Sequence, residues 1–300
     1  MNKHTPKSHG YPDHIFQIFI VAVGLVSVLT MIELSQLLVF SLVAIAIFFI
    51  GIPHGALDVI VIEKQCVKRL PCQSYAVKRI ILYGLYLLLV LACFLFWQSS
   101  PLLGLVSFYV LAILHFQEDW FELEHFFARV CLAAMLLSAS AWFYSDNLSS
   151  LFKLLGNNQL DSERCVFLLK LLNSVSLMSV LFIRAFHHFV MARIKLTCGI
   201  LLAAYLLPPL AFFVAYFCAF HSILHTKQVM NDYHLSKLAF IRWVTLPMIG
   251  TGLLALVFFS KFDTILTLGE NLFSTTFILL FALTVPHMML TMWSKKQSRS

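Results

Sequence analysis

Charged side chains are scarce in this sequence. Asp, Glu, Lys and Arg make up 12% of the 300 residues, whereas apolar residues make up 60%, and the mean hydropathy is +0.88. Soluble domains carry about a quarter of their residues as charges, so the composition excludes a soluble enzyme and a disordered chain. The apolar residues form continuous runs, without the in-and-out alternation of an outer-membrane barrel. The class that remains is a polytopic membrane protein built from helices.

Cysteine is also sparse. The seven cysteines form no CxxC pair and several lie inside apolar runs, so we expect reduced thiols that pack as small apolar side chains. This excludes a disulfide-stapled secreted module. A cleavable signal peptide is not expected either, because residues 1–14 are polar and the next run, Ile15–Ile32, has spanning length without a small-residue cleavage site.

Hydropathy divides the chain into apolar segments, and a membrane-spanning helix needs about 20 such residues. The segments are Ile15–Ile32, Gln36–Ile62, Ile80–Trp97, Leu102–Glu118, Val130–Tyr144, Val166–Ile183, the stretch Val190–His225, Trp243–Phe259 and Phe273–Trp293. The stretch from Val190 is too long for one ordinary span, and Pro208 and Pro209 lie in its middle. Two consecutive prolines remove two backbone donors, so they either kink one helix or separate two.

The basic residues of the loops distinguish these alternatives. With ten spans, almost all Lys and Arg of the loops lie on the side of the N-terminus, and only Lys153, Arg164 and Lys261 lie on the other. With nine spans, the two sides become much more even. Cytoplasmic loops are enriched in Lys and Arg. We therefore expect an all-α bundle of about ten transmembrane helices (nine if the prolines only kink a helix) in the inner, plasma membrane, with both termini cytoplasmic.

The expected organisation is simple. A polar tail (residues 1–14) precedes a single membrane-embedded catalytic domain (15–293), which a short basic tail (294–300) follows. The net charge of +7 does not indicate nucleic-acid binding, because the basic residues lie in short loops where they set topology. The lipid bilayer is the partner that this organisation predicts.

Histidine carries the functional information. Of the twelve histidines, seven lie in polar tails, loops or turns: His4, His9, His14, His125, His187, His188 and His234. The other five lie in or at the ends of apolar runs: His54, His115, His221, His225 and His287. Ionisable residues in membrane spans are costly and usually face the bundle interior, so a functional role is the default interpretation there. An interhelical hydrogen bond is the alternative for each one singly.

Four of these five are predicted to reach the same depth. His54, His115 and the pair His221 and His225 lie near the ends of the second, fourth and eighth spans, and each even-numbered span runs from outside to inside. His221 and His225 are four residues apart, which places both rings on one helix face. The four imidazoles predict a metal site toward the cytoplasmic side. His287, near the end of the last span, stays open as a ligand or as a pocket-lining group.

Two aspartates follow these histidines at a distance of four residues. A carboxylate one turn away can accept the second ring N–H of a ligating histidine and strengthen it as a donor. We expect Asp58 to act in this way, on His54 or on a histidine of another helix. Asp119, four residues after His115, belongs to an acidic interfacial stretch, and its contribution stays open, as does that of His187 and His188.

The donor set narrows the choice of metal. Imidazole ligands suit zinc, copper, iron and nickel. A zinc ion with four imidazoles would be closed and structural, whereas iron would keep positions for dioxygen. A site in an apolar bundle also points to an apolar substrate.

Four motifs occur in a fixed order along the chain. They are GIPHGALD (51–58), LHFQED (114–119), YFCAFHSILH (216–225) shortly after Leu207-Pro208-Pro209, and TVPH (284–287). Together they resemble the signatures of the Brp/Blh family of membrane β-carotene 15,15′-dioxygenases. Departures are mild: Gln117 stands where the family often has glycine, and the first span is additional or variable.

The resemblance implies a reaction and a ligand set. It implies that O2 cleaves β-carotene at its central 15,15′ double bond into two molecules of all-trans-retinal. Fe(II) would be held by four histidines, which correspond to His54, His115, His221 and His225 here. A rhodopsin-type protein is the natural recipient of the retinal, although no residue of this chain encodes that partner.

Other functional classes place histidines in membrane helices as well. A membrane di-iron desaturase or hydroxylase acting on a lipid needs about eight ligands in HxxHH-type boxes, and only His187-His188 approaches that pattern. A non-enzymatic haem protein and a proton-coupled transporter are further alternatives. Iron stoichiometry separates the di-iron enzyme from a single-iron enzyme, a Soret band would identify a haem protein, and a protein without metal would indicate the transporter.

Overall fold

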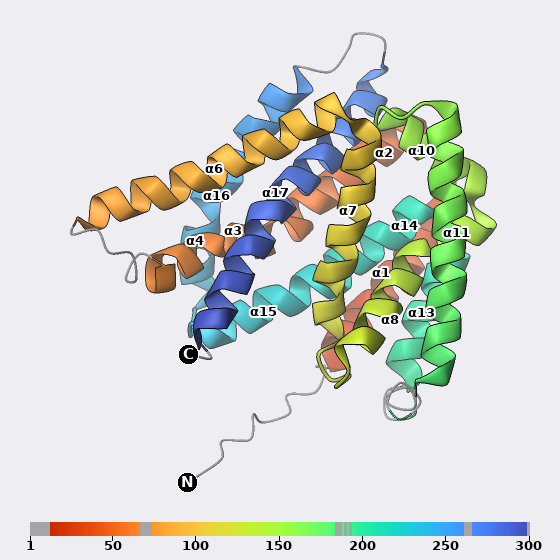
Figure 1. The fold of residues 1–300 in the computed structure, drawn as a ribbon, viewed down its shortest axis with the longest axis horizontal. Helices are drawn as coiled ribbons and strands as arrows, with labels where there is room; N and C mark the ends of the chain where they lie inside the picture. Colours follow the sequence, from red (N-terminus) through yellow and green to blue (C-terminus); the bar gives the residue numbers. More distant parts are fainter. Residues whose placement is uncertain are drawn as a thin grey trace.

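The computed structural model describes residues 13–66, 74–183, 188, 191, 194–260 and 266–298. All regular structure in this part of the chain is helical, as the composition predicted (Figure 1). The elements are α1 (Asp13–Thr30), α2 (Gln36–Ala46), η1 (Ile47–Gly51), α3 (Pro53–Ala56), α4 (Asp58–Val61), η2 (Ile62–Cys66), α6 (Tyr75–Ser99), α7 (Pro101–Phe116), η3 (Gln117–Trp120), α8 (Phe126–Ser138), α9 (Ser140–Phe143), α10 (Ser145–Leu154), α11 (Gln159–Phe182), α13 (Ile194–Leu206), α14 (Pro209–Val214), η4 (Ala215–Ser222), α15 (Ile223–Asp232), α16 (Lys237–Phe259) and α17 (Leu268–Ser298).

The described residues contain eight helices that are long and apolar enough to cross a membrane, and two shorter apolar helices, His14–Thr30 and Lys195–Leu206. Together they coincide with the ten expected segments. The helical membrane fold is therefore confirmed. Large apolar side chains also cover the outer surface, as expected for helices that face lipid.

The Pro208-Pro209 pair interrupts the helix. Helix α13 ends at Leu206, Pro208 is extended (φ −53°, ψ 150°), and α14 begins at Pro209. The hydroxyl of Tyr144, the residue after α9, donates to the carbonyl of Leu206 at 2.7 Å, so the C-terminal ends of α9 and α13 lie side by side. From there α14 and α15 run back across the molecule (Figure 1). The prolines thus separate two helices, as the ten-span alternative requires.

Helix α17 forms the centre of the bundle and contacts α2, α6, α7 and α16. In the most apolar segment of α17, 67% of the residues are buried inside the protein. The corresponding share for α16 is 11%, because α16 lies at the periphery. Helices α6 and α16 both pack against α17. The rings of Phe94 (α6) and Phe258 (α16) stack on each other with their centroids 3.8 Å apart. This arrangement puts the C-terminal span beside the segments that carry the histidines.

The topology can be tested with reporter fusions. We expect a fusion after Leu207 to report the outside and a fusion within residues 231–237 to report the cytoplasm, because α14 and α15 return the chain across the membrane. Paired phosphatase and fluorescent-protein reporters measure both sides. A cytoplasmic signal after Leu207 would show that the prolines do not mark an external turn.

Candidate metal centre

A π-helical segment positions His54. Segment η1 precedes Pro53, and the N–H of Ile52 donates to the carbonyl of Ile47 five residues back at 2.8 Å. The His54 Nδ1 donates to the Gly51 carbonyl at 2.5 Å, so Nε2 is the nitrogen left for a ligand. A Cβ at Gly51 would lie 2.5 Å from Cε1 of the buried Phe217 ring, so a larger residue there would displace that ring. π-Turns inside helices are frequent at functional sites.

His115 lies in the last turn of α7, and the chain then tightens into the 3₁₀ turn η3. The sequence spacing placed Asp119 one α-turn beyond His115, where it could accept from that ring. The tighter turn carries Asp119 instead to the helix with His221 and His225. The contribution of Asp119, which the sequence left open, is therefore made to histidines of another helix.

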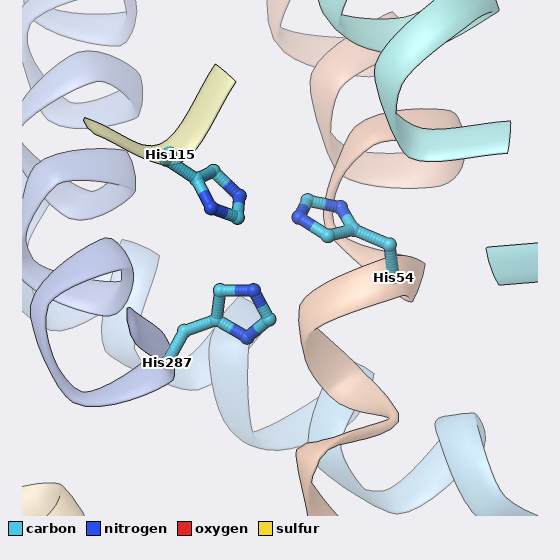
Figure 2. Close-up of side chains that lie close together, drawn as sticks. All are labelled: His54, His115 and His287. Carbon is cyan, nitrogen blue, oxygen red and sulfur yellow. The ribbon is translucent and has the colours of Figure 1, made fainter. Parts of the chain in front are cut away.

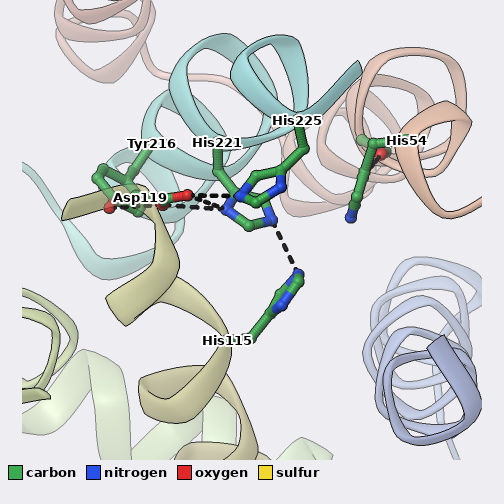
Figure 3. A network of polar contacts seen from close by, with 7 residues as sticks. His54, His115, Asp119, Tyr216, His221 and His225 are labelled. Atoms are coloured by element: carbon green, nitrogen blue, oxygen red, sulfur yellow. Dashed lines mark hydrogen bonds and ion pairs between the residues drawn. The ribbon is translucent and has the colours of Figure 1, made fainter. Parts of the chain in front are cut away.

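Asp119 is fully buried and organises three side chains (Figure 3). Its Oδ1 accepts from Nδ1 of His221 at 2.8 Å and from Nε2 of His225 at 2.9 Å. Its Oδ2 accepts from the hydroxyl of Tyr216 at 2.8 Å. A carboxylate that accepts a ring N–H fixes the tautomer and strengthens the opposite nitrogen as a ligand. Nε2 of His221 and Nδ1 of His225 are thereby the nitrogens available to an ion.

Asp58 plays the corresponding part on the other side of the centre. Its Oδ1 accepts from Nδ1 of His287 at 2.8 Å, and its Oδ2 accepts from the hydroxyl of Tyr86 at 3.0 Å. The backbone at Leu57 separates α3 from α4 (ψ −8°), which turns Asp58 away from His54. Of the two partners that the sequence left open for Asp58, the structure supports a histidine on another helix.

Five imidazole rings converge on one place inside the bundle. The ring centroid of His54 lies 5.1 Å from that of His221, 5.3 Å from His287, 6.1 Å from His115 and 6.4 Å from His225. His54, His115, His221 and His287 are each at least nine-tenths buried. Figure 2 shows His54, His115 and His287 directed toward a common space. The structure thus brings together the four predicted ligands and adds His287.

The ligand atoms form two groups that share a contact. Those of His54, His115 and His287 lie within 4.8 Å of one another, and those of Asp119, His221 and His225 form a second group of the same size. The Nε2 atoms of His221 and His115, which join the groups, are 3.0 Å apart, within the distance of about 4.2 Å that can separate two ligands bonded to one ion at about 2.1 Å each. A metal ion can therefore be bound between the two groups. The donors are imidazole nitrogens, and those of His221, His225 and His287 are backed by a carboxylate. Imidazole donors suit iron, zinc, copper or nickel.

The remaining described histidines lie away from this centre. His14, His125, His188 and His234 are exposed on the surface. His4, His9 and His187 fall outside the described residues, so the predictions for them are not tested here. An HxxHH-type box at His187-His188 is not supported by the position of His188, which is exposed.

A cavity of about 810 Å³ adjoins the histidines. His54, His115 and His287 form part of its wall, and most of the remainder is apolar. Apolar lining residues include Phe108, Ala112, Phe116, Phe213, Phe217, Leu254, Val257, Leu280 and Leu283. The lining also includes Leu87 of α6 and Leu246 and Leu253 of α16, which are 55%, 76% and 60% exposed on the outer surface. The cavity therefore leads from the lipid-facing surface between α6 and α16 to the imidazole rings.

Part of the cavity wall is polar. The buried Glu63 carboxylate accepts from Nε of Arg79 at 2.5 Å and from the hydroxyl of Tyr83 at 2.9 Å, and all three residues line the cavity. These bonds tie η2 to α6. Because these polar groups satisfy each other, the apolar part of the wall remains the larger binding surface.

The fold and site define a helical membrane protein with a buried centre of histidines beside an apolar cavity. Residues 45–295 match the family described as beta-carotene 15,15′-dioxygenase, and the chain belongs to that family. A protein of that name from the uncultured marine bacterium 66A03 is 30% identical over 264 residues, which covers 81% of this chain and 90% of the relative. No solved structure matches.

Two tyrosines escaped the sequence analysis. Tyr86 and Tyr216 each donate a hydroxyl to one of the buried aspartates. Tyr216 lies five residues before His221 inside a quoted motif, and Tyr86 lies in an apolar helix with no motif around it. A phenol in the middle of a span was the available signal, since a buried hydroxyl usually needs a partner.

We expect Asp119→Asn to weaken metal binding by about 10–100-fold, the usual cost of losing a hydrogen-bond partner behind a ligand. Asparagine keeps the shape but removes the charge and presents N–H groups to rings that already donate. Metal per chain and affinity in the purified protein measure the effect. Glu124→Gln, an exposed change in the same acidic stretch, is the control. Equal metal binding by both variants and the wild type would contradict this role.

Proposed function

We propose that this protein cleaves β-carotene with O2 at the central 15,15′ double bond and releases two molecules of all-trans-retinal. The observation that carries the proposal is the convergence of buried imidazoles on the wall of a largely apolar cavity. Family membership and the name of the relative support the substrate and the reaction. The overall reaction is balanced, since each aldehyde takes one oxygen atom of O2.

The cofactor in this proposal is Fe(II), held by His54, His115, His221 and His225. Bound Fe(II) would supply the electrons and the binding position that O2 needs to react with an alkene. The protein's own part is to hold His221 and His225 in their metal-binding tautomers through Asp119 and His54 through the Gly51 carbonyl, while Asp58 fixes the His287 ring beside them. Asp58 contributes as a positioning residue. The apolar wall excludes water from the reacting bond.

The cavity also explains how a water-insoluble substrate reaches the centre. Because its wall includes the lipid-facing leucines of α6 and α16, a carotenoid dissolved in the bilayer can enter sideways without crossing water. We place the protein in the plasma membrane with the histidines toward the cytoplasm, on the basis of the Lys and Arg distribution. Transfer of retinal to a rhodopsin-type protein belongs to the same proposal.

Co-expression with β-carotene biosynthesis in a bacterial host tests the reaction. We expect the cells to lose their orange colour and to accumulate retinal, measured by chromatography.

Alanine variants of the four ligands test the site. Each should abolish cleavage and lower bound iron: His54→Ala, His115→Ala, His221→Ala and His225→Ala. The exposed His125→Ala should retain both cleavage and iron. Unchanged colour with inserted protein, or aldehydes longer than retinal, would refute central cleavage. Two irons per chain would favour the di-iron alternative.

A second variant pair tests the cavity. Gly250 lines it, and a Cβ at that position would meet nothing within 4 Å, so Gly250→Phe should fold and project its ring into the cavity. We expect retinal formation to fall by about tenfold or more, as for other misfits of a few carbons in an apolar pocket. Bound iron should not change. Gly84→Phe is the matched control, because Gly84 has the same open surroundings on α6 and lies outside the cavity wall. Equal activity of both variants would show that this cavity does not hold the substrate.

A further inference from the structure

We propose that His287 is a fifth imidazole ligand of the metal centre. This inference rests on the proposed function, because it concerns the same ion, and it extends the ligand set beyond the four histidines of the second, fourth and eighth spans. The last span would then be bonded directly to the centre. His287 comes from α17, which lies in the middle of the bundle.

The position of the His287 ring is that of a ligand. Its centroid lies 5.3 Å from that of His54 and 5.1 Å from that of His115, within the range of distances among the four other rings. A ring nitrogen of His287 lies within 4.8 Å of ring nitrogens of His54 and His115. The ring is as strongly buried as the rings of His54 and His115.

The support behind His287 repeats the support behind His221. In each case one Nδ1 donates to a buried aspartate at 2.8 Å, and a tyrosine hydroxyl donates to the second carboxylate oxygen. Each arrangement leaves Nε2 as the nitrogen for an ion. A buried carboxylate in a membrane span is expensive, and Asp58 directs one of its oxygens at this ring. That cost is understandable when the carboxylate orients a metal ligand.

The backbone around His287 is also adapted to the ring. Pro286 lies inside α17 directly before it, and proline interrupts the regular hydrogen bonding of a helix. On the opposite side lies Gly55 of α3, where a Cβ would lie 4.0 Å from Nδ1 of His287, an ordinary contact distance. The proline in α17 and the small residue in α3 leave the imidazole facing His54 and His115.

Cobalt substitution tests the assignment without relying on turnover. The full-length protein is purified, stripped of metal and titrated with Co(II), whose visible absorption reports the number and type of ligands. The variants are His287→Gly, which leaves room for free imidazole, and His287→Gln, which keeps volume and a hydrogen-bond donor toward Asp58. His125→Gly, an exposed loop change, is the matched control.

We expect His287→Gly to weaken Co(II) binding by about tenfold or more, at least the cost of losing a group that merely supports a ligand. Its absorption spectrum should change, and added imidazole should restore it. If His287→Gly does not fold, the Co(II) absorption spectrum of His287→Gln tests the same assignment, and we expect it to differ from that of the wild type. Wild-type affinity and spectrum in a folded variant would overturn the fifth ligand while leaving the four-histidine site intact. Failure of the wild type to bind Co(II) or Fe(II) would refute both proposals.

Discussion

Two buried carboxylates are the constraint on which the centre depends. Asp58 and Asp119 lie in spans, where an unpaired charge would cost several kcal/mol. Each aspartate is paired with an imidazole N–H of another helix and with a tyrosine hydroxyl. These bonds cross-link α4 to α6 and α17, and η3 to η4 and α15. The groups that would tune the metal are thus also the groups that hold the helices in register.

The irregular helical segments follow from the same requirement. Segments η1 and η4 are π-helical, contact each other and carry or precede His54 and His221. A regular α-helix rotates each side chain by a fixed angle, so it cannot direct every ring of a crowded site inward. An extra residue per turn changes that angle locally. The close approach of Gly51 to the Phe217 ring, where a Cβ would not fit, fixes how the two π-segments pack.

The sequence was sufficient for the parts of the fold that depend on composition. The apolar runs located the membrane helices, and the Lys and Arg distribution correctly separated α13 from α14 at Pro208. The histidines of the apolar runs proved to be the ones that meet. The partners of the aspartates could not be read from spacing, because the 3₁₀ turn at Gln117–Trp120 and the break at Leu57 displace Asp119 and Asp58 from their expected faces. Tertiary packing, which the spacing of residues does not encode, decides those turns.

The position of the centre relative to the cavity connects the chemistry to the fold. His54, His115 and His287 belong to the cavity wall, and so do Phe108 and Leu280, which lie about two helical turns before His115 and His287, and Glu63, which lies nine residues after His54. The lining therefore extends along the helices on both sides of the histidines. A site at the closed end of a pocket would reach only the terminus of a long substrate. A site on the side wall faces the interior of a chain that extends both ways, which is the geometry that cleavage at a central double bond requires. In the proposed function, the exposed leucines of α6 and α16 would let such a chain enter from the bilayer, while an ion held by the histidines would stay buried.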